Sequence, residues 1–551
     1  MGAAVTAVAT ADARFARLAA EEWAWRLGQF PQLATSVGES AYDDRLAAIP
    51  AEAMSPAARI DRAVYENQLH GLIATIESHA DRMPINGDSS FFGPLVDLCD
   101  AQPLGDTGEY RRFLARLADI PRFFAEHIDL MREGLATGYT VPQAVLEGRD
   151  QPLAAIAGAA DPTATPFWKP FAAFPVGVPE QDRPALQEEA SRVIGGLVLP
   201  AYRGLLAFMR ETYVPGARRT TAACDLPDGD AFYAAQIRHY TTLPLSADEI
   251  HERGLQEVAR ILAQMHELRR QAGFDGDMPA FLEFLRTDAQ FYARTPHELL
   301  AHASWIAKRI DGLLPKFFGV LPRQPYGVAP VPDAIAPFYT TGRYVPAPRP
   351  TGHAGTYWVN THALGSRALY TLPALTLHEA VPGHHLQIAL AAEMQGQPAY
   401  RRHGFVDAYG EGWALYAEHL GDEMGVYLTP YEQFGRLTYE MWRAARLVVD
   451  TGLHAKRWSR EAARAYLLAH TALSAHEVAT EVDRYVGWPG QALSYKIGEL
   501  TIRELRARAE RALGGRFDLR AFHDAVLALG SVPLGLLEER MAAWVAERLA
   551  S

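Results

Sequence analysis

The stretch 377–385 places three histidines and one glutamate within nine residues. His378 directly precedes Glu379, and His384 and His385 follow six and seven residues after His378. Zinc hydrolases use these groups, with neutral imidazoles as metal ligands and a neighbouring carboxylate as the general base toward a water molecule. The stretch is therefore a candidate metal site that activates water.

The spacing of these histidines differs from H-E-x-x-H, in which two histidines stand one helical turn apart on one face. On a regular helix His384 would lie about 240° around and roughly 9 Å along the axis from His378. That separation is too large for one metal with bonds of about 2 Å. Pro382 and Gly383 lie between the two histidines, and both residue types allow a helix to deform. We therefore predict that the helix is widened or broken between Ala380 and Gly383. The alternatives are an ordinary helix-breaking turn, or a helix that begins only at Pro382.

A second pair of acidic residues follows, because Glu411 lies 27 residues after His384 and Glu418 stands seven residues further on. Residues seven apart share one face of a helix. That face otherwise carries Ala414 and Leu415, so two carboxylates occupy positions where apolar side chains are expected. A buried carboxylate needs a partner, and a metal or a ligating histidine provides one.

Four blocks carry a resemblance to a known family. They are His378-Glu-x-x-Pro-Gly-His-His, Glu411-Gly-Trp-Ala-Leu-Tyr, Arg446-Leu-Val-Val-Asp-Thr-Gly-Leu-His454 and Pro489-Gly-Gln-Ala-Leu-Ser-Tyr-Lys-Ile-Gly498. In this order they resemble the bacterial domain-of-unknown-function 885 family over nearly the whole chain, most densely over about 340–540. That family is similar to helical zinc peptidases such as thimet oligopeptidase, neurolysin and carboxypeptidase Taq. Those enzymes carry H-E-x-G-H and then two glutamates seven residues apart, which Gly383-His384 and Glu411 with Glu418 match.

The resemblance implies a zinc ion held by His378, His384 and Glu411, with a fourth position for water. Glu379 would take a proton from that water and return it to the leaving amine. Glu418 would accept a hydrogen bond from a ligating histidine or fix the helix.

Further residues have alternative roles in this scheme. His385 is either the alternative second ligand or a donor near the scissile carbonyl, pointing toward the substrate cleft. Tyr495 is the candidate donor to the oxyanion, and core packing is its alternative. Lys496 is a candidate for binding a substrate carboxylate. Asp450 and His454, four residues apart, would orient each other or a ligand, or form a local polar pair.

The composition narrows the class of protein. The 551 residues are 49% hydrophobic and 21% charged, as in soluble globular proteins with a large core. A net charge of −12 without a Lys/Arg run argues against a nucleic-acid partner. No signal peptide and no run of 18 apolar residues is recognised, which predicts no membrane partner. Two cysteines outside any CxxC motif predict reduced thiols and a cytoplasmic location. The oligomeric state is left open.

The elements expected around these residues are almost all helical. Amphipathic helices are predicted at 12–29, 56–82, 108–136, 184–214 and 246–272, and N-terminal capping signals begin at Ser246, Thr295, Thr429 and Ser474. Residues 322–355 are irregular, and 356–360 predict a short strand whose edge pairs with an extended substrate, or a structural hairpin. The loop 349–355 would present Arg349 or His353 to the substrate. The expected fold is mainly α, a neurolysin-like zincin fold around a deep cleft with a small β element beside the active-site helix. A helical wall (1–320) and a catalytic region (321–551) would interleave as one structural unit.

Three functions follow from these predictions. The first is a zinc metallopeptidase that cleaves short peptides. The second is a metal-dependent lyase or amidohydrolase acting on a small amide or amino-acid derivative, to which the unusual motif spacing points. The third is a non-catalytic helical binding protein, against which the intact Glu379 argues.

Overall fold

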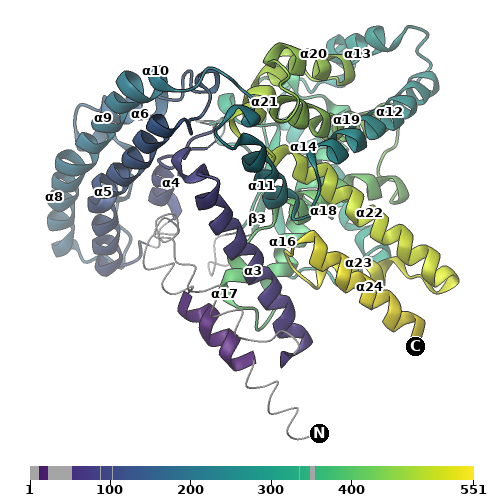
Figure 1. Ribbon diagram of the computed structural model, residues 1–551, viewed down its shortest axis with the longest axis horizontal. Coiled ribbons are helices and arrows are strands. Elements are labelled where there is room, and N and C mark those ends of the chain that lie inside the picture. The colour runs from purple at the N-terminus through teal and green to yellow at the C-terminus, as the bar shows by residue number, and fades with distance from the viewer. Residues whose placement is uncertain are drawn as a thin grey trace, which may run out of the picture.

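The structure is a computed structural model that describes residues 12–22, 53–86, 89–101, 104–333, 335–347 and 354–550. Helices dominate these residues, and three short strands form a single sheet among them (Figure 1). The expected mainly α class is confirmed.

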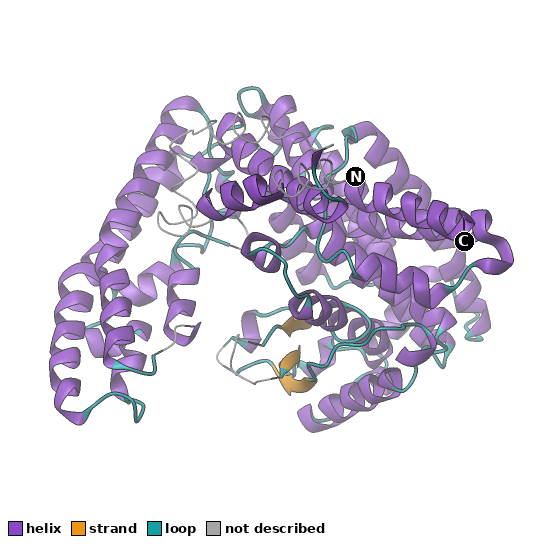
Figure 2. Cartoon of the chain, turned by 90° about the horizontal axis from the view of Figure 1, so that it is seen from below, coloured by secondary structure: helices purple, strands orange, loops and turns teal. Residues whose placement is uncertain are grey.

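The first part of the chain forms a helical limb that projects to the left in Figures 1 and 2. Its helices are α4 (Pro94–Ala101), α5 (Thr107–Thr137), α6 (Gln151–Ala157), α7 (Lys169–Ala172), α8 (Arg183–Val193), α9 (Leu199–Phe208) and α10 (Val214–Gly216). The helix predicted at 184–214 is present but interrupted by two π-helical turns, Ile194–Val198 and Met209–Tyr213. The helical run Glu180–Gly216 contains an 18-residue window with a mean hydropathy of 1.3, which is long and apolar enough to cross a membrane. Of that window, 44% is buried inside the protein. A core helix of a soluble protein has the same properties, so the absence of a membrane partner stays a prediction.

The body contains α3 (Pro56–Glu77), α11 (Gly229–Thr241), α12 (Ala247–Gln271), α13 (Met278–Thr287) and α14 (Pro296–Asp311). Of these helices, α12 and α14 begin directly after the predicted capping residues Ser246 and Thr295. The Ser246 side chain accepts from the Glu249 N–H, and the Glu249 carboxylate accepts from the Ser246 N–H. This reciprocal cap confirms the predicted start of α12. Of the helix predicted at 12–29, residues 12–22 are helical and the rest lies outside the described residues.

The sheet contains β1 (Tyr326–Pro330), β2 (Gly342–Val345) and β3 (Gly355–Val359) in the order β1-β3-β2. β3 pairs parallel with β1, with Val328 opposite Tyr357, and antiparallel with β2, with Tyr344 opposite Tyr357. The strand predicted at 356–360 is therefore the central strand, with both backbone edges paired. The expectation that its edge pairs with substrate is wrong, because the edge beside the candidate site belongs to β2. Arg349 and His353 lie outside the described residues.

The remaining helices form the rest of the body: α15 (Leu372–Glu379), α16 (His384–Glu393), α17 (Ala399–His403), α18 (Asp407–Glu423), α19 (Pro430–His454), α20 (Arg460–His470), α21 (Ala475–Gly487), α22 (Ser494–Leu513), α23 (Leu519–Leu527) and α24 (Leu534–Ala550). Some of them approach one another closely at glycines. A Cβ on Gly254 of α12 would stand 2.8 Å from the Leu447 side chain of α19. A Cβ on Gly412 of α18 would stand 2.5 Å from the backbone of Gly498 in α22.

Two large hydrophobic cores each take residues from both sides of residue 320. One joins Phe113 and Tyr202 of the limb to Phe434 and Val448 of α19, and the other joins Ile306 of α14 to residues of α15, α18 and α22. Because apolar burial crosses residue 320 in both cores, neither half can bury its apolar surface without the other.

Candidate metal centre

The helix that carries His378 is broken where the sequence predicted it. α15 ends at Glu379, a turn spans 380–383, and α16 begins at His384. The Gly383 N–H donates to the Leu377 carbonyl (2.9 Å), six residues back instead of four. A Cβ on Gly383 would lie 1.9 Å from the His378 carbonyl oxygen. Only glycine therefore fits this close approach. The end of α15 at Glu379 and the start of α16 at His384 confirm the predicted break between Ala380 and Gly383.

The break brings His378 and His384 to Glu411 of α18. The Glu411 Oε2 atom lies 3.5 Å from His378 Nε2 and 3.4 Å from His384 Nε2, and one ligand atom of each residue lies within 4.8 Å of the others. Ligand atoms at 2.0–2.1 Å around a tetrahedral zinc stand roughly 3.3 Å apart. Glu411 Oε2 is buried without a hydrogen-bond partner in the described structure, and a cation at this point would satisfy it. The side chains of His384 and Glu411 are 12% and 16% exposed, so the cluster is accessible from one side.

Glu418 holds His378 in the orientation that a metal ligand needs. The His378 Nδ1–H donates to Glu418 Oε1 at 2.7 Å, so the Nε2 lone pair faces Glu411 and His384. A carboxylate behind a ligating histidine fixes its tautomer and raises its basicity. Without a metal, burial lowers the pKa of His378, but Glu411 and Glu418 together raise it to about 9, so a metal that binds at Nε2 would displace a proton. Burial raises the pKa of Glu411, yet His384 and His378 hold it well below its usual range.

Glu379 is positioned by the edge strand β2. Its Oε2 accepts from the backbone N–H of Tyr344 at 2.7 Å, and the residue is 9% exposed. In turn, the Tyr344 hydroxyl bonds His385 Nδ1 at 3.0 Å. The candidate base is therefore oriented by a strand that lies 35 residues before it.

His385 does not lie where the sequence placed it. We expected its ring to face the substrate, but the residue is 2% exposed and packs between the tyrosines of β1 and β2. Its ring centroid is 4.6 Å from that of Tyr326 and 5.2 Å from that of Tyr344. The reason is geometric, because successive residues of a helix point about 100° apart. When His384 faces α18, His385 faces the sheet. A direct contact with substrate is excluded by this burial.

The second block, on α18, also locks the broken helix. Trp413 is fully buried, and its indole N–H donates to the Pro382 carbonyl at 2.8 Å. The Pro382 carbonyl lies in the turn 380–383, where the regular pattern of helical hydrogen bonds is interrupted. Trp413 thus secures the turn that brings His384 to the cluster.

Tyr495 is linked to the cluster through other side chains. Its half-buried ring lies under the guanidinium groups of Arg446 (4.6 Å) and Arg443 (5.9 Å). Arg443 Nη2 is 3.9 Å from Glu418 Oε1, and Glu418 holds His378. Two residues therefore stand between Tyr495 and His378 on this path, and the oxyanion role of Tyr495 stays a prediction.

Lys496 cannot bind a substrate carboxylate in this structure. The residue is fully buried, and its Nζ pairs with Glu257 (3.0 Å), Glu440 (2.9 Å) and Glu499 (2.8 Å). The earlier expectation is wrong because three internal carboxylates from α12, α19 and α22 already neutralise the ammonium group. Lys496 is an interior ion-pair residue.

One prediction is that Asp450 and His454 orient each other. This prediction is wrong, because each side chain bonds to other partners. Asp450 accepts from the Tyr233 hydroxyl (2.6 Å) and from the Gly490 N–H (3.1 Å). His454 Nδ1 accepts from the Ala223 N–H (3.1 Å), and its Nε2–H donates to the Tyr485 carbonyl (2.9 Å). Both are fully buried and hold different segments together.

Sequence reasoning missed Arg343 of β2. Its side chain is exposed, and its strand neighbour Tyr344 holds Glu379 through the backbone. Desolvation lowers the pKa of Arg343, but Tyr339 and the carboxylates of Glu379 and Glu411 raise it overall. No local sequence pattern marks Arg343, because strand β2 has only four residues and is too short to show a clear alternation of polar and apolar side chains.

Among the solved structures that are similar to this chain, two match over nearly the full length of both chains. One, from Colwellia psychrerythraea, is 27% identical with a TM-score of 0.83 and covers 98% of this chain and 99% of its own. The other, from Shewanella oneidensis, is 17% identical with a TM-score of 0.68, covers 96% and 99%, and shows the fold alone. Each is described as a "putative lipoprotein". None of the curated proteins matches the chain. The family model of bacterial proteins of unknown function (DUF885) matches residues 31–541, and the chain belongs to that family.

Proposed function

We propose that this protein is a zinc-dependent hydrolase with a neurolysin-like zincin arrangement, most simply a peptidase that cleaves short peptides in a helical cleft. The observation that carries the proposal is the convergence of His378, His384 and Glu411, with a buried Glu411 oxygen that has no hydrogen-bond partner in the part of the chain that the structure describes. Two neutral imidazoles and one carboxylate are a donor set typical of catalytic zinc. A zinc ion held there would supply a Lewis acid that polarises a carbonyl and lowers the pKa of a water molecule.

Glu379 would act as the general base. One of its oxygens is held by the Tyr344 N–H, which fixes the carboxylate plane so that the other oxygen can take a proton from an attacking water. The same oxygen can then return the proton to the leaving amine. His385 contributes indirectly, because its bond to the Tyr344 hydroxyl steadies the strand that orients Glu379.

Two groups are candidates to stabilise the negative charge on the substrate oxygen. Arg343 is the better supported, because it is exposed and electrostatically coupled to both Glu379 and Glu411. Tyr495 is the second. The edge of β2 would pair with an extended peptide backbone, which suits a substrate of variable sequence.

An amidohydrolase or lyase that acts on a small amide or amino-acid derivative is the second candidate function. The motif favours it, because the spacing of His378 and His384 departs from that of the peptidase motif H-E-x-x-H. A purely structural zinc site would be closed by a fourth protein ligand, whereas this cluster has three and an adjacent carboxylate base. A non-catalytic role is therefore less well supported.

The location of the protein is part of the proposal. The two cysteines favour a cytoplasmic location. Each of the two similar solved chains is described as a "putative lipoprotein", and a lipid anchor on this chain would instead place it at a membrane surface. Fractionation of cells producing the full-length chain decides between the two locations.

Metal analysis followed by a peptide-library digest tests the function. Protein purified without chelator should contain one zinc per chain and should cleave members of the library. Cleavage of amino-acid amides alone would favour the second function. Protein that contains no metal after supply of zinc, and that cleaves neither class, would refute both.

A further inference from the structure

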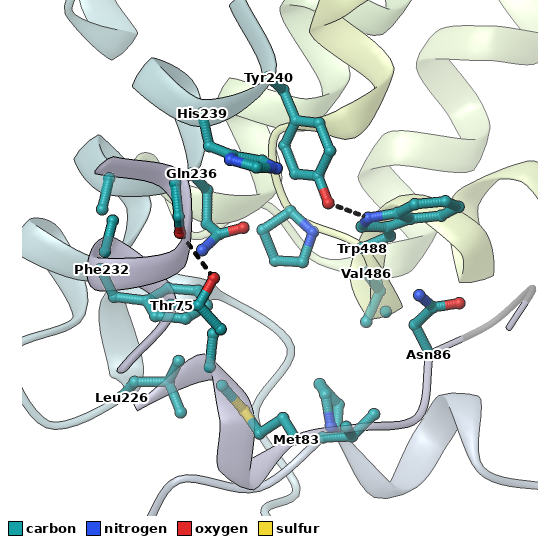
Figure 3. Close-up of a pocket in the computed structure, with 18 of the residues that line it drawn as sticks. Thr75, Met83, Asn86, Leu226, Phe232, Gln236, His239, Tyr240, Val486 and Trp488 are labelled. Atoms are coloured by element: carbon teal, nitrogen blue, oxygen red, sulfur yellow. Dashed lines mark hydrogen bonds between the residues drawn. The ribbon is translucent and has the colours of Figure 1, made fainter. Parts of the chain in front are cut away.

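A cavity of about 220 Å³ lies between α3, α11 and the turn that follows α21 (Figure 3). Figure 3 shows the side chains of Gln236 and His239 reaching toward it from α11, with Asn86 on the opposite side. The Tyr240 hydroxyl accepts from the Trp488 indole N–H and closes one end. The volume equals roughly that of seven liquid waters, which is the size of an amino acid.

Two buried residues that the metal centre does not use hold the walls of this cavity. Asp450 of α19 ties Tyr233 of α11 to Gly490, directly after the lining residues Trp488 and Pro489. These bonds fix α11 against the turn.

His454, one helical turn further along α19, fixes the other walls. It binds the Ala223 N–H, three residues before the lining residue Leu226, and the Tyr485 carbonyl, directly before the lining residue Val486. Asp450 and His454 of the third sequence block therefore hold the walls of this cavity, and their hydrogen bonds run to its walls and not to the zinc ligands.

The described residues that line the cavity carry positive charge and no negative charge. None of its described lining residues is acidic, and Arg218 is a lining residue. Arg218 donates to the carbonyls of Thr140 (2.8 Å), Thr220 (3.0 Å) and Ala222 (2.7 Å). Carbonyl oxygens orient a guanidinium but do not neutralise it.

The acidic residue near Arg218 is already engaged. Asp225 pairs with Arg457 at 2.9 Å. Burial lowers the pKa of Arg218 to about 10, so the group stays charged at neutral pH. A charged guanidinium in a partly buried cavity, with no carboxylate ion pair among the described residues, favours an anionic ligand.

The rest of the lining is apolar, with Met83, Leu226 and Phe232 among its members. We propose that this cavity binds an amino-acid-sized carboxylate, with Arg218 pairing the carboxylate and the apolar wall receiving a hydrophobic side chain. The amide of Gln236 would supply a further hydrogen bond. Two sources share this chemistry, a free amino acid and the carboxyl end of a short peptide. Binding here does not depend on the hydrolase proposal.

Calorimetric titration of the full-length Glu379→Gln variant tests the proposal without turnover. The probes are L-leucine, L-leucyl-L-leucine and L-leucinamide. We expect at least one of the two carboxylates to bind at least about tenfold more tightly than leucinamide, because only the carboxylates pair with Arg218. Tighter binding of leucine assigns a free amino acid, and tighter binding of the dipeptide assigns a peptide end.

Variants locate the binding. Arg218→Gln should weaken carboxylate binding at least about tenfold, and Arg219→Gln, at the exposed neighbouring position, should leave it unchanged. Because Arg218→Gln also removes bonds to three carbonyls, Ala235→Trp provides a second variant that fills the cavity and leaves Arg218 in place. Unchanged binding in a folded Ala235→Trp protein, equal binding of leucinamide, or no binding of any probe to the parent chain would overturn the proposal. Carboxylate binding by a parent chain that takes up no zinc and cleaves neither peptides nor amides would leave the cavity proposal standing and remove the hydrolase proposal.

Discussion

Substitution of Gly383 by alanine should remove the metal without touching a ligand. A Cβ at this position would lie 1.9 Å from the His378 carbonyl oxygen and 2.4 Å from that of Leu377, whereas real Cβ contacts stay above 3.0 Å. The turn must therefore shift by about 1 Å, and both close atoms belong to backbone that cannot rotate away. Gly383 has φ −74°, so the need for glycine comes from this approach and not from a left-handed conformation.

The size of the effect follows from the position of the turn. His384 directly follows Gly383, and metal–ligand distances tolerate about 0.2 Å. A shift of about 1 Å would take His384 out of bonding range. Crowding of a packed interior also costs about 1–3 kcal/mol of unfolding free energy. We expect Gly383→Ala to fold with reduced stability and to lose most of its zinc.

The assay combines zinc stoichiometry by plasma mass spectrometry with thermal unfolding followed by circular dichroism. Gly365→Ala is the matched control, because a Cβ there meets nothing within 4 Å. The control should keep the parental zinc content and the parental midpoint of thermal unfolding. Full zinc occupancy together with parental stability in Gly383→Ala would refute the argument from the broken helix.

Three further predictions concern single side chains. Glu379→Gln should keep zinc and fold while turnover falls by about 10²–10⁴-fold, because an amide cannot accept the proton; near-parental turnover on any cleaved substrate would point to another base. His378→Ala and Glu411→Ala should each lose zinc, since each removes one of three ligands, and full occupancy in both would remove the ligand assignment. Burial raises the pKa of Asp450 from its ordinary value of 3.8 to about 7, so its contribution to stability is full below about pH 4 and is lost as pH rises toward 7. Asp450→Asn should therefore flatten the decline of the unfolding free energy over that range in denaturant titrations, and an unchanged slope would contradict the raised pKa.

The sequence by itself determined features that depend on neighbouring residues. Helix starts at Ser246 and Ser474 follow from a side chain and a glutamate three residues apart, and both capping boxes are present. The break before His384 follows from the 3.6-residue period of the helix and from the Pro382–Gly383 pair. The E-x6-E spacing also placed Glu418 behind His378, because residues two turns apart share one face.

The tertiary structure alone decided which groups meet across long separations in the chain. Lys496 looked available to substrate, but carboxylates 239 residues before it, in α12, and 56 before it, in α19, enclose it. Tyr344 became the partner of Glu379 because the order β1-β3-β2 puts β2 beside α15. Burial and ion pairing of this kind depend on how distant elements pack. Local spacing therefore predicts the residue types of the metal centre, and packing decides which polar residues outside it are free to bind a ligand.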